Sequence, residues 1–279
     1  MTIAIVTYQP DIPRLSENLQ AALASKEARR VMVYDNHSDN VADIRRLTDA
    51  DDRCQLIEGD ENHGIAFALN VLCQRALDAG SEWVLTLDQD SVIPEGLLTE
   101  FARHTAQEGV GIICPAIVDR NMGREYSRQT AGTEFVSTCI TAGNLVRLSA
   151  WQQCGGYSEE LFIDGVDFDF CMKMRETGWK ILRTHDVCLL QEVGHARRIP
   201  LPFHHQMTLL NHPPQRLYYI ARNYLYIGRR HHQRWHWTVE VVKRLFIVAC
   251  FESPRLPKLR AMFLGIRHYR QGKMGKYDI

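Results

Sequence analysis

Two aspartates stand one residue apart in the segment Asp88-Gln89-Asp90, directly after the apolar run of residues 83–87. The run predicts a buried strand, which puts both carboxylates at its C-terminal end, where open α/β sheets bind their ligands. Two carboxylates this close can share a hard divalent cation and leave positions for phosphate oxygens. Aspartates also end strands as turn formers or helix caps, so the pair needs support from the rest of the chain.

The hydrophobic pattern predicts the elements that would position this pair. Short β-branched runs alternate with helical patterns, which predicts a largely parallel sheet covered on both faces by helices. Strands are expected at residues 3–6, 30–34, 55–58, 83–87 and 110–113, with helices at residues 13–25, 41–49, 64–79 and 94–108. Further strands are expected at residues 135–141 and 179–183, and the chain reads as helical and basic from about Pro213 onward.

Polar residues follow four successive predicted strands and would meet at one edge of the sheet. They are Thr7 and Tyr8, then Asp35 and Asn36, then Asn62 and Gly64 with Asn70 on the next helix, and finally Asp88 and Asp90. A carboxylate can accept a hydrogen bond from the imide of a nucleotide base, and a glycine allows close backbone approach. Each strand end alone is ordinary turn chemistry, but the four together indicate a nucleotide-binding edge.

Length and composition suit a medium-sized enzyme. With 279 residues, 45% of them hydrophobic, the chain can bury one substantial core with a smaller appendage. Its eight cysteines form no Cys-X-X-Cys pair, which argues against a zinc ribbon or a disulfide framework and suits a reducing compartment. The apolar start at residues 2–6 is too short for a signal peptide, and no apolar stretch is long enough for a bilayer. We therefore expect a cytoplasmic protein, at most peripheral on the inner face of the membrane.

Charge is distributed unevenly along a chain whose formal net charge is zero. Residues 1–214 hold 19 basic and 30 acidic residues, a net −11, whereas residues 215–279 hold 14 basic and 3 acidic residues, a net +11. Such a basic region attracts nucleic acid, anionic lipid or a phosphorylated ligand, or docks as a helical face on an acidic domain. The acidic main part opposes a nucleic-acid binder. Apolar residues interleaved with Lys243 and Arg244 suit a helix lying on an anionic bilayer, with a packed helix as the alternative.

The motifs together resemble the family-two inverting glycosyltransferases with a GT-A fold. The matching segments are Thr7-Tyr8, residues 33–38, Asn62-X-Gly64-X-Ala66 with Asn70, and residues 87–91. Residues 85–91 are similar to the bacterial rhamnosyltransferase branch, which builds O-antigens and related surface glycans. The resemblance implies a Rossmann-like, mostly parallel α/β sheet flanked by helices over residues 1–212. Residues 1–114 would form the nucleotide-sugar half and residues 115–212 the acceptor half, followed by a basic helical region at residues 213–279.

The resemblance also implies roles for individual residues. It assigns contacts with the nucleotide sugar to Thr7, Tyr8, Asp35, Asn62, Gly64, Asn70 and Asp88. It assigns contact with the pyrophosphate to Arg216 or Arg222. Asp90, helped by Asp88, would hold Mg²⁺ or Mn²⁺, and His195 is either a further ligand or a structural histidine. Gly143, Asn144 and Asp164 would bind the acceptor.

The resemblance assigns the role of general base to Asp167, which would follow a strand-like stretch and lie at the start of a helix. Val166 stands where relatives often have Glu, so this base would work without that neighbour. Asp169 is expected to orient the helix or to pair with Lys173 or Arg175.

The reaction implied is a single displacement at an anomeric carbon, in which one base takes the proton of the acceptor hydroxyl. The expected donor is dTDP-β-L-rhamnose, and the expected acceptor is a surface-glycan hydroxyl, free or polyprenyl-linked. UDP-galactofuranose or a UDP-hexose remains an alternative donor. A nucleotidyltransferase is an alternative enzyme class. It would require a Gly-rich phosphate loop after the first strand, and residues 7–10 do not form such a loop.

Overall fold

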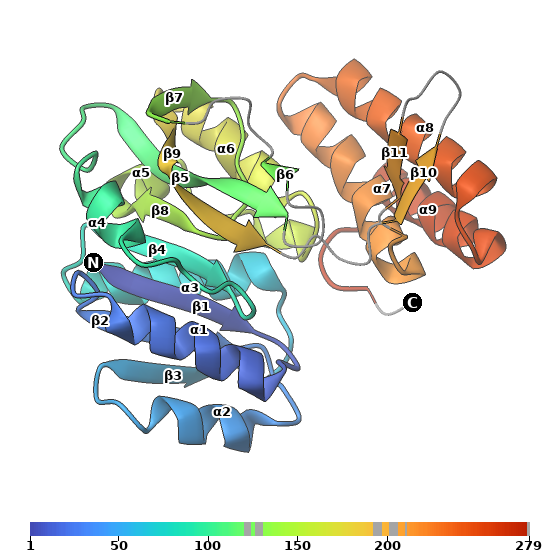
Figure 1. Cartoon of the computed structure of the whole chain (residues 1–279). Coiled ribbons are helices and arrows are strands. Elements are labelled where there is room, and N and C mark those ends of the chain that lie inside the picture. Colours follow the sequence, from blue (N-terminus) through green and yellow to red (C-terminus); the bar gives the residue numbers. More distant parts are fainter. Residues whose placement is uncertain (120–123, 126–130, 192–196, 201–205, 210, 278–279) are drawn as a thin grey trace. The chain divides into compact units, whose positions relative to one another are not determined.

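The computed structural model of the chain describes residues 1–119, 124–125, 131–191, 197–200, 206–209 and 211–277 (Figure 1). The chain divides into two compact units. The first consists of Met1–Glu159 and Asp167–Gln191, and the second of Glu160–Val166 and Glu192–Ile279. The second unit thus begins before the predicted boundary at residue 213 and includes a short segment from the middle of the predicted acceptor half.

The first unit opens with the predicted alternation of strands and helices. Its elements are β1 (Thr2–Thr7), α1 (Ile12–Ala24), β2 (Arg30–Asp35), α2 (Val41–Thr48), β3 (Cys54–Glu58), α3 (Ile65–Asp78), β4 (Trp83–Asp88) and α4 (Leu97–Ala102). Strands β3, β2, β1 and β4 are neighbours in that order and run parallel. Helix α4 is shorter than predicted, because Gly96 (φ +82°) precedes it and the chain turns after Ala102. Four carboxyl ends therefore lie at one edge, as expected.

The rest of the first unit makes the sheet mixed. It comprises β5 (Val110–Asp119), β6 (Arg124–Glu125), β7 (Thr133–Val136), β8 (Asn144–Arg147), α5 (Leu148–Gln153), α6 (Val166–Glu176, from Asp167 on) and β9 (Lys180–Gln191). The 3₁₀ turn η1 (Glu159–Leu161) begins in this unit and ends in the second. The sheet continues from β4 in the order β8, β5, β9, β7. Strand β8 is antiparallel to both β4 and β5. The strand predicted at residues 135–141 ends at Val136, and β8 was not predicted.

Packing follows from the alternation of side chains along the central strands. Every residue of β1 is buried, as expected for a strand covered on both faces. Ile3 and Ile5 share a hydrophobic cluster with Leu15 and Leu19 of α1. Helix α3 contacts the same strands and covers the other face of the sheet (Figure 1). This sandwich fixes the positions of the strand ends.

The second unit is helical, with a small hairpin. It contains β10 (Arg197–Pro200) antiparallel to β11 (Gln206–Leu209), and helices α7 (Pro214–Arg230), α8 (Arg234–Phe251) and α9 (Arg255–Arg270). Leu217, Val241 and Met262 belong to the core that joins these helices. Gly265 lets α9 approach α7 closely, because a Cβ there would collide with the carbonyl oxygen of Tyr218. Within the described part of the chain, no helix combines the length and apolarity needed to cross a membrane.

Candidate active site

Asp35, at the end of β2, is the centre of a hydrogen-bond network at the carboxyl edge of the sheet. Its Oδ1 accepts hydrogen bonds from Thr7 Oγ1 (2.9 Å) and Ser38 Oγ (2.5 Å), and its Oδ2 accepts one from the Ser38 backbone N–H (2.8 Å). Thr7 reaches it because β1 and β2 pair with Thr7 opposite Asp35. The side chain is 1% exposed. These donors fix its orientation and leave a lone pair on Oδ2 for a ligand N–H.

The ends of β1 and β4 are joined by side-chain hydrogen bonds. The backbone N–H of Tyr8 donates to Oε1 of Gln89 at 2.8 Å. The Tyr8 residue is 49% exposed, so its ring faces outward at this edge. On the helix side of β4, Asn18 Nδ2 donates to the carbonyl oxygen of Asp88 at 2.8 Å. The segment that carries the two aspartates is therefore held from both sides.

The loop between β3 and α3 is bound to the end of β2. Asn62 Oδ1 accepts the N–H of Gly64 at 2.9 Å, a local turn that uses this oxygen. Asn36, next to Asp35, accepts the N–H of His63 at 3.2 Å and donates to the carbonyl oxygen of Gly64 at 3.3 Å. Gly64 has φ +87°, a conformation that favours glycine. The structure therefore brings Thr7, Asp35, Asn62 and Gly64 to one edge.

Asp88 and Asp90 occupy the end of β4 and the turn that follows it. Asp88 is partly exposed and Asp90 is exposed. Among the described residues, no group of three or more His, Cys, Asp or Glu side chains could hold a metal. His195, the further ligand considered from the sequence, lies outside the described residues. The described part of the site thus offers two hard oxygen ligands, the type that Mg²⁺ and Mn²⁺ bind.

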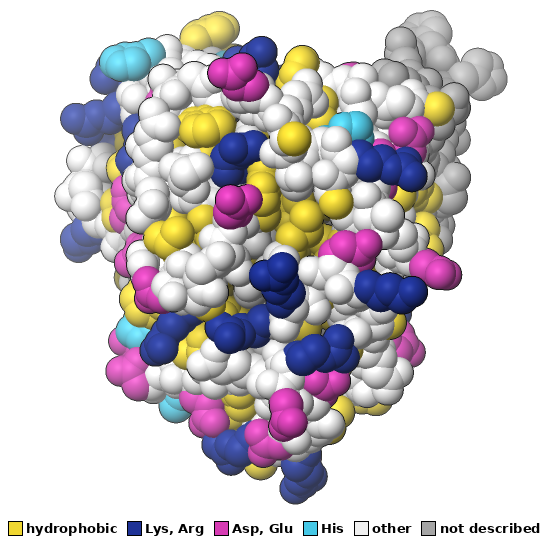
Figure 2. Space-filling model, turned by 90° about the vertical axis from the view of Figure 1, so that its left-hand side faces the viewer, with side chains coloured by type: hydrophobic (Ala, Val, Ile, Leu, Met, Phe, Trp, Pro, Cys, Tyr) yellow, Lys and Arg dark blue, Asp and Glu magenta, His cyan; other side chains and the backbone are white. Residues whose placement is uncertain are grey.

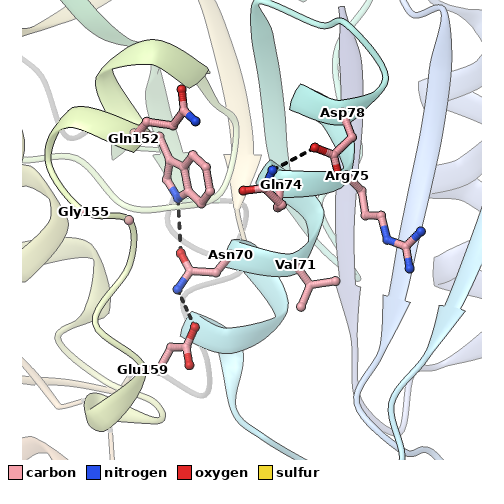
Figure 3. Close-up of a pocket in the computed structure, with 10 residues that line it drawn as sticks. Asn70, Val71, Gln74, Arg75, Asp78, Gln152, Gly155 and Glu159 are labelled. Carbon is pink, nitrogen blue, oxygen red and sulfur yellow. Dashed lines mark hydrogen bonds between the residues drawn. The ribbon is translucent and has the colours of Figure 1, made fainter.

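Asn70, on α3, was predicted to contact the nucleotide, and its amide is hydrogen-bonded to protein groups. Its Nδ2 donates to the carbonyl oxygen of Tyr157 (2.9 Å) and to Glu159 Oε1 (2.8 Å). Its Oδ1 accepts from Trp151 Nε1 (3.2 Å) and from the Tyr157 N–H (2.8 Å). All four hydrogen-bonding positions of the amide are used by protein groups. Asn70 therefore anchors the segment after α5 to α3, beside a surface hollow of about 590 Å³ (Figure 3).

The predicted acceptor floor lies at the start of β8. Gly143 has φ +78°, and a Cβ there would stand 2.8 Å from Leu189 Cδ2, so the close packing requires glycine. Asn144 is 3% exposed, and its Nδ2 donates to Cys139 Sγ at 3.2 Å. Its Oδ1 is buried and has no hydrogen-bond partner among the described residues. A buried amide oxygen of this kind can accept a hydrogen bond from a donor group of a bound molecule.

Asp167 lies in the first turn of α6 and is partly exposed. Its Oδ1 accepts the N–H of Phe168 at 2.9 Å. The stretch before it is a 3₁₀ turn followed by bends, not the strand expected from its apolar residues. Asp169 is fully buried and accepts a 2.5 Å hydrogen bond from Ser158 Oγ, to which Lys173 Nζ also donates at 3.4 Å. These bonds fix the start of the helix.

In the second unit, Asp164 is bound by Arg216. The guanidinium donates through Nη2 to Oδ1 (2.5 Å) and through Nε to both carboxylate oxygens (3.2 and 3.3 Å). The Asp164 side chain is 7% exposed and that of Arg216 is 46% exposed. Burial raises the pKa of the Asp164 carboxyl, and Arg216 opposes that rise. An acceptor hydroxyl, the partner predicted for Asp164, would have to share this carboxylate with Arg216.

Arg222, the other arginine predicted for the pyrophosphate, is buried and directs its hydrogen-bond donors at backbone carbonyl oxygens. It is 1% exposed, and its nitrogens donate to the carbonyl oxygens of Gly275 (2.7 Å) and Leu161 (3.2 Å). The adjacent Asn223 is fully buried, and its Nδ2 donates to the carbonyl oxygens of Leu161, Ile163 and Asp164 at 2.7–2.9 Å. The two side chains shape the segment of residues 160–166.

Cationic side chains gather near Arg216, among them Arg244, which the sequence placed only on a basic helix and not at a site. Burial, together with Arg216, Arg244 and Lys258, lowers the pKa of His212 to about 4. Arg244, on α8, has a side chain 17% exposed and lies 3.6 Å from Glu252. It was missed because only the fold brings it near Arg216, from another helix.

At the opposite edge of the sheet, where β1, β2 and β4 begin, the residues that the structure describes form no comparable grouping. A hollow of about 640 Å³ lies there, lined by both basic and acidic residues such as Lys26, Glu27, Arg30 and Glu82. Figure 2 faces this edge and shows basic and acidic side chains interspersed. The candidate active site is therefore assigned to the carboxyl edge.

Comparison with known proteins identifies the family. Residues 2–164 match the model of glycosyl transferase family 2. The chain belongs to this family. Over 254 residues it is 28% identical to the dTDP-rhamnosyl transferase RfbF of Shigella flexneri, covering 82% of this chain and 79% of that protein. The family and this relative make the protein a glycosyltransferase, as predicted.

Solved structures of glycosyltransferases share its fold. TarS of S. aureus (residues 1–349) superposes with a TM-score of 0.59 at 14% identity, over the whole of this chain and 94% of that one. The mannosyltransferase PcManGT from Pyrobaculum calidifontis, in complex with GDP-Man and Mn²⁺, gives a TM-score of 0.59 at 16% identity, over 98% of this chain and 82% of that one. The predicted GT-A fold is confirmed.

Proposed function

We propose that this glycosyltransferase moves L-rhamnose from dTDP-β-L-rhamnose to a hydroxyl of a bacterial surface glycan, with inversion at the anomeric carbon. The observation that carries the donor assignment is the likeness to the dTDP-rhamnosyl transferase RfbF, which extends over 82% of the chain. It therefore extends well beyond the region matched by the family model, which ends at residue 164.

The nucleotide would bind at the carboxyl edge of β1, β2 and β4. Asp35 is fixed by Thr7 and Ser38 and keeps a lone pair for a base N–H. Tyr8 offers an exposed ring, and Gly64 opens helix α3 with backbone close to Asn36. These groups make a rigid half-site in which the sugar is presented at the end of β4.

A divalent cation fits the end of β4. Asp90, with Asp88, supplies hard oxygen ligands and would leave the remaining positions for diphosphate oxygens and water. Bound there, Mg²⁺ or Mn²⁺ would neutralise charge that develops on the leaving diphosphate. PcManGT, which has the same fold, was solved with Mn²⁺.

Asp167 would act as the general base. Its carboxylate, in the first turn of α6, would take the proton of the acceptor hydroxyl as that oxygen attacks C1 of the sugar. The C1–O bond to the nucleoside diphosphate breaks in the same displacement, which inverts the configuration and releases dTDP. Asn144 Oδ1, buried without a partner among the described residues, would accept a hydrogen bond from a hydroxyl of the acceptor.

Arg216 is the arginine we assign to a diphosphate. Its guanidinium is half exposed, and Arg244 lies near enough, with Arg216 and Lys258, to depress the pKa of His212. A locally positive region of this kind attracts phosphate groups. We assign Arg222 a structural role instead, because its donors are directed at carbonyl oxygens inside the second unit.

We also propose that the second unit contacts the membrane that carries a polyprenyl-linked acceptor. Trp235, Val242 and Phe246 are 81, 58 and 62% exposed, and their spacing of seven and four places them on one face of α8. The apolar residues of α8 therefore fall into two groups. One group is exposed, whereas Trp237 and Val241 are buried in the core.

Helix α9 adds a basic and apolar outer face. Leu256 and Phe263 are 67 and 60% exposed and alternate with the exposed Arg260 and Arg267. Exposed apolar side chains among arginines, in a region of net charge +11, match an anionic bilayer surface.

The donor assignment is tested by presenting purified protein with a panel of nucleotide sugars and either Mg²⁺ or Mn²⁺. Release of dTDP from dTDP-β-L-rhamnose, faster than release of UDP from UDP-galactofuranose or a UDP-hexose, is expected. Faster turnover of a UDP-sugar would refute the donor. The anomeric configuration of the product, read by NMR, tests inversion.

The membrane assignment is tested with vesicles of phosphatidylcholine, with and without phosphatidylglycerol. Trp235→Ser combined with Phe246→Ser should weaken binding to the anionic vesicles by about 10²- to 10⁴-fold, since burying each aromatic side chain is worth roughly 1.5–3 kcal/mol and the two together roughly 3–6 kcal/mol. Phe135→Ser, a similarly exposed aromatic of the first unit, is the matched control and should bind as wild type. Equal binding by all three proteins would refute a membrane role for this face.

A further inference from the structure

Three cysteine side chains gather in the first unit although they are far apart in the sequence. Cys114 lies on β5, Cys139 in the segment before β8 and Cys171 on α6. The Sγ atoms of Cys139 and Cys171 are 3.7 Å apart. The Cys171 sulfur also lies 3.5 Å from the backbone nitrogen of Cys139 and 3.6 Å from its carbonyl oxygen. Interaction with the Cys139 thiol lowers the pKa of Cys114.

The three cysteine residues differ in how far they are exposed. Cys114 and Cys171 are 2% and 1% exposed, whereas Cys139 is only partly buried. A small oxidant from solvent would thus reach Cys139 before Cys171, whose sulfur is in contact with that of Cys139.

We propose that Cys139 and Cys171 form a reversible disulfide. The bond requires the sulfurs to close from 3.7 Å to about 2.05 Å, a shift of about 1.7 Å. Cys139 belongs to a non-helical, non-strand segment, which can move, while Cys171 is held in the middle of α6.

Oxidised glutathione is a sufficient oxidant. The Cys139 thiolate attacks one glutathione sulfur, forming a mixed disulfide and releasing one glutathione thiolate. The Cys171 thiolate then attacks the Cys139 sulfur and releases the second glutathione. Two protein thiols lose two electrons and two protons, and one glutathione disulfide becomes two thiols. Hydrogen bonds with Cys114 and Cys171 raise the pKa of Cys139, so the first step should accelerate as pH rises.

The cross-link would join two elements that the proposed function assigns to the acceptor. Cys139 precedes Gly143 and Asn144 by four and five residues, and Asn144 Nδ2 donates to its sulfur. Cys171 lies one helical turn after Asp167 on α6. A shift of this size in a positioning group can cost roughly 10²-fold in rate. On the premise of the proposed function, oxidation should lower transfer by about 10- to 100-fold while donor affinity holds.

The test uses full-length protein carrying Cys250→Ser, which removes the exposed cysteine. After incubation with oxidised glutathione and alkylation of the remaining thiols, peptide mass spectrometry should identify a Cys139–Cys171 cross-link that dithiothreitol reverses. Cys171→Ser should stop at glutathionylated Cys139, and Cys54→Ser should form the cross-link as the parent does. This readout needs no enzymatic activity, so it stands even if the donor assignment fails.

Absence of the cross-link in the folded parent protein, or its persistence in Cys171→Ser through Cys114, would overturn the proposal. Transfer is then measured before and after oxidation, and after reduction. A reversible fall in the parent that is absent in Cys171→Ser supports the inhibitory effect. Unchanged transfer by fully cross-linked protein would refute that effect.

Discussion

Asn223 provides the most direct test of how the second unit holds the segment before α6. Its amide is fully buried, and Nδ2 lies within 2.9, 2.7 and 2.8 Å of the carbonyl oxygens of Leu161, Ile163 and Asp164. Its Oδ1 accepts a fourth hydrogen bond from Arg222 Nε at 2.9 Å. Replacing Asn223 by Leu keeps a similarly branched side chain and removes all four interactions.

The expected loss of stability follows from these contacts. A net hydrogen bond contributes about 0.5–1.5 kcal/mol, and a buried group left without a partner costs about 1–3 kcal/mol. Burial of the new leucine offsets part of this, by up to about 1.5–3 kcal/mol. We therefore expect Asn223→Leu to lower the free energy of unfolding by about 2–4 kcal/mol.

Urea unfolding followed by tryptophan fluorescence measures the change, with the slope compared between variants. Gln215→Leu is the matched control, because it also replaces a side-chain amide by leucine, at an exposed position of α7, and should stay within about 0.5 kcal/mol of wild type. Hydrogen exchange of residues 160–166 should rise in Asn223→Leu alone. A loss below about 0.5 kcal/mol with unchanged exchange would refute the role of Asn223 in fixing this segment.

Three further predictions concern the proposed chemistry and the pH dependence of stability. Asp90→Ala should abolish transfer, and EDTA should inactivate the wild type until Mn²⁺ or Mg²⁺ is restored; full activity in excess EDTA would contradict the metal site. Asp167→Asn should lower transfer by roughly 10²–10⁴-fold with donor affinity unchanged in calorimetry, and near-wild-type transfer would exclude it as the base. His212, with a pKa lowered to about 4, binds its proton less readily when folded, so its contribution to stability is present above its unfolded pKa and lost as pH falls toward 4. The melting temperature of wild type should therefore drop more than that of His212→Gln between pH 7 and pH 5, and parallel curves would refute the shift.

The half predicted to bind the nucleotide sugar, residues 1–114, was largely predictable because its signals are local. The five predicted strands up to residue 113 are present, and each predicted end lies within a few residues of the observed one except at β5, which continues to Asp119. Continuous apolar runs such as β1 can only be buried on both faces, and this leaves little choice of architecture. The polar residues that follow these runs meet at one edge because parallel strands share a direction.

The half predicted to bind the acceptor, residues 115–212, was harder to predict because its strands are short and paired across long sequence distances. β8 has only four residues and is recognisable through its partners β4 and β5, which precede it by dozens of residues. The apolar residues of the segment before Asp167 indicated a strand. In the structure the carbonyl oxygens of Leu161 and Ile163 accept hydrogen bonds from Asn223, some sixty residues later in the chain. No pattern within the segment reveals that partner.

Arg216 and Arg222 show how one helix separates two roles that the sequence could not assign. A separation of six residues puts the two side chains on different faces of α7, so they cannot serve one ligand in the same way. Arg222 faces inward, where a guanidinium is tolerated because carbonyl oxygens accept its hydrogens. Arg216 faces outward and holds Asp164, whose buried carboxylate would otherwise be costly. A diphosphate that drew Arg216 away would leave Asp164 without this stabilisation, so phosphate binding and the conformation of the segment before Asp167 should be coupled through this ion pair.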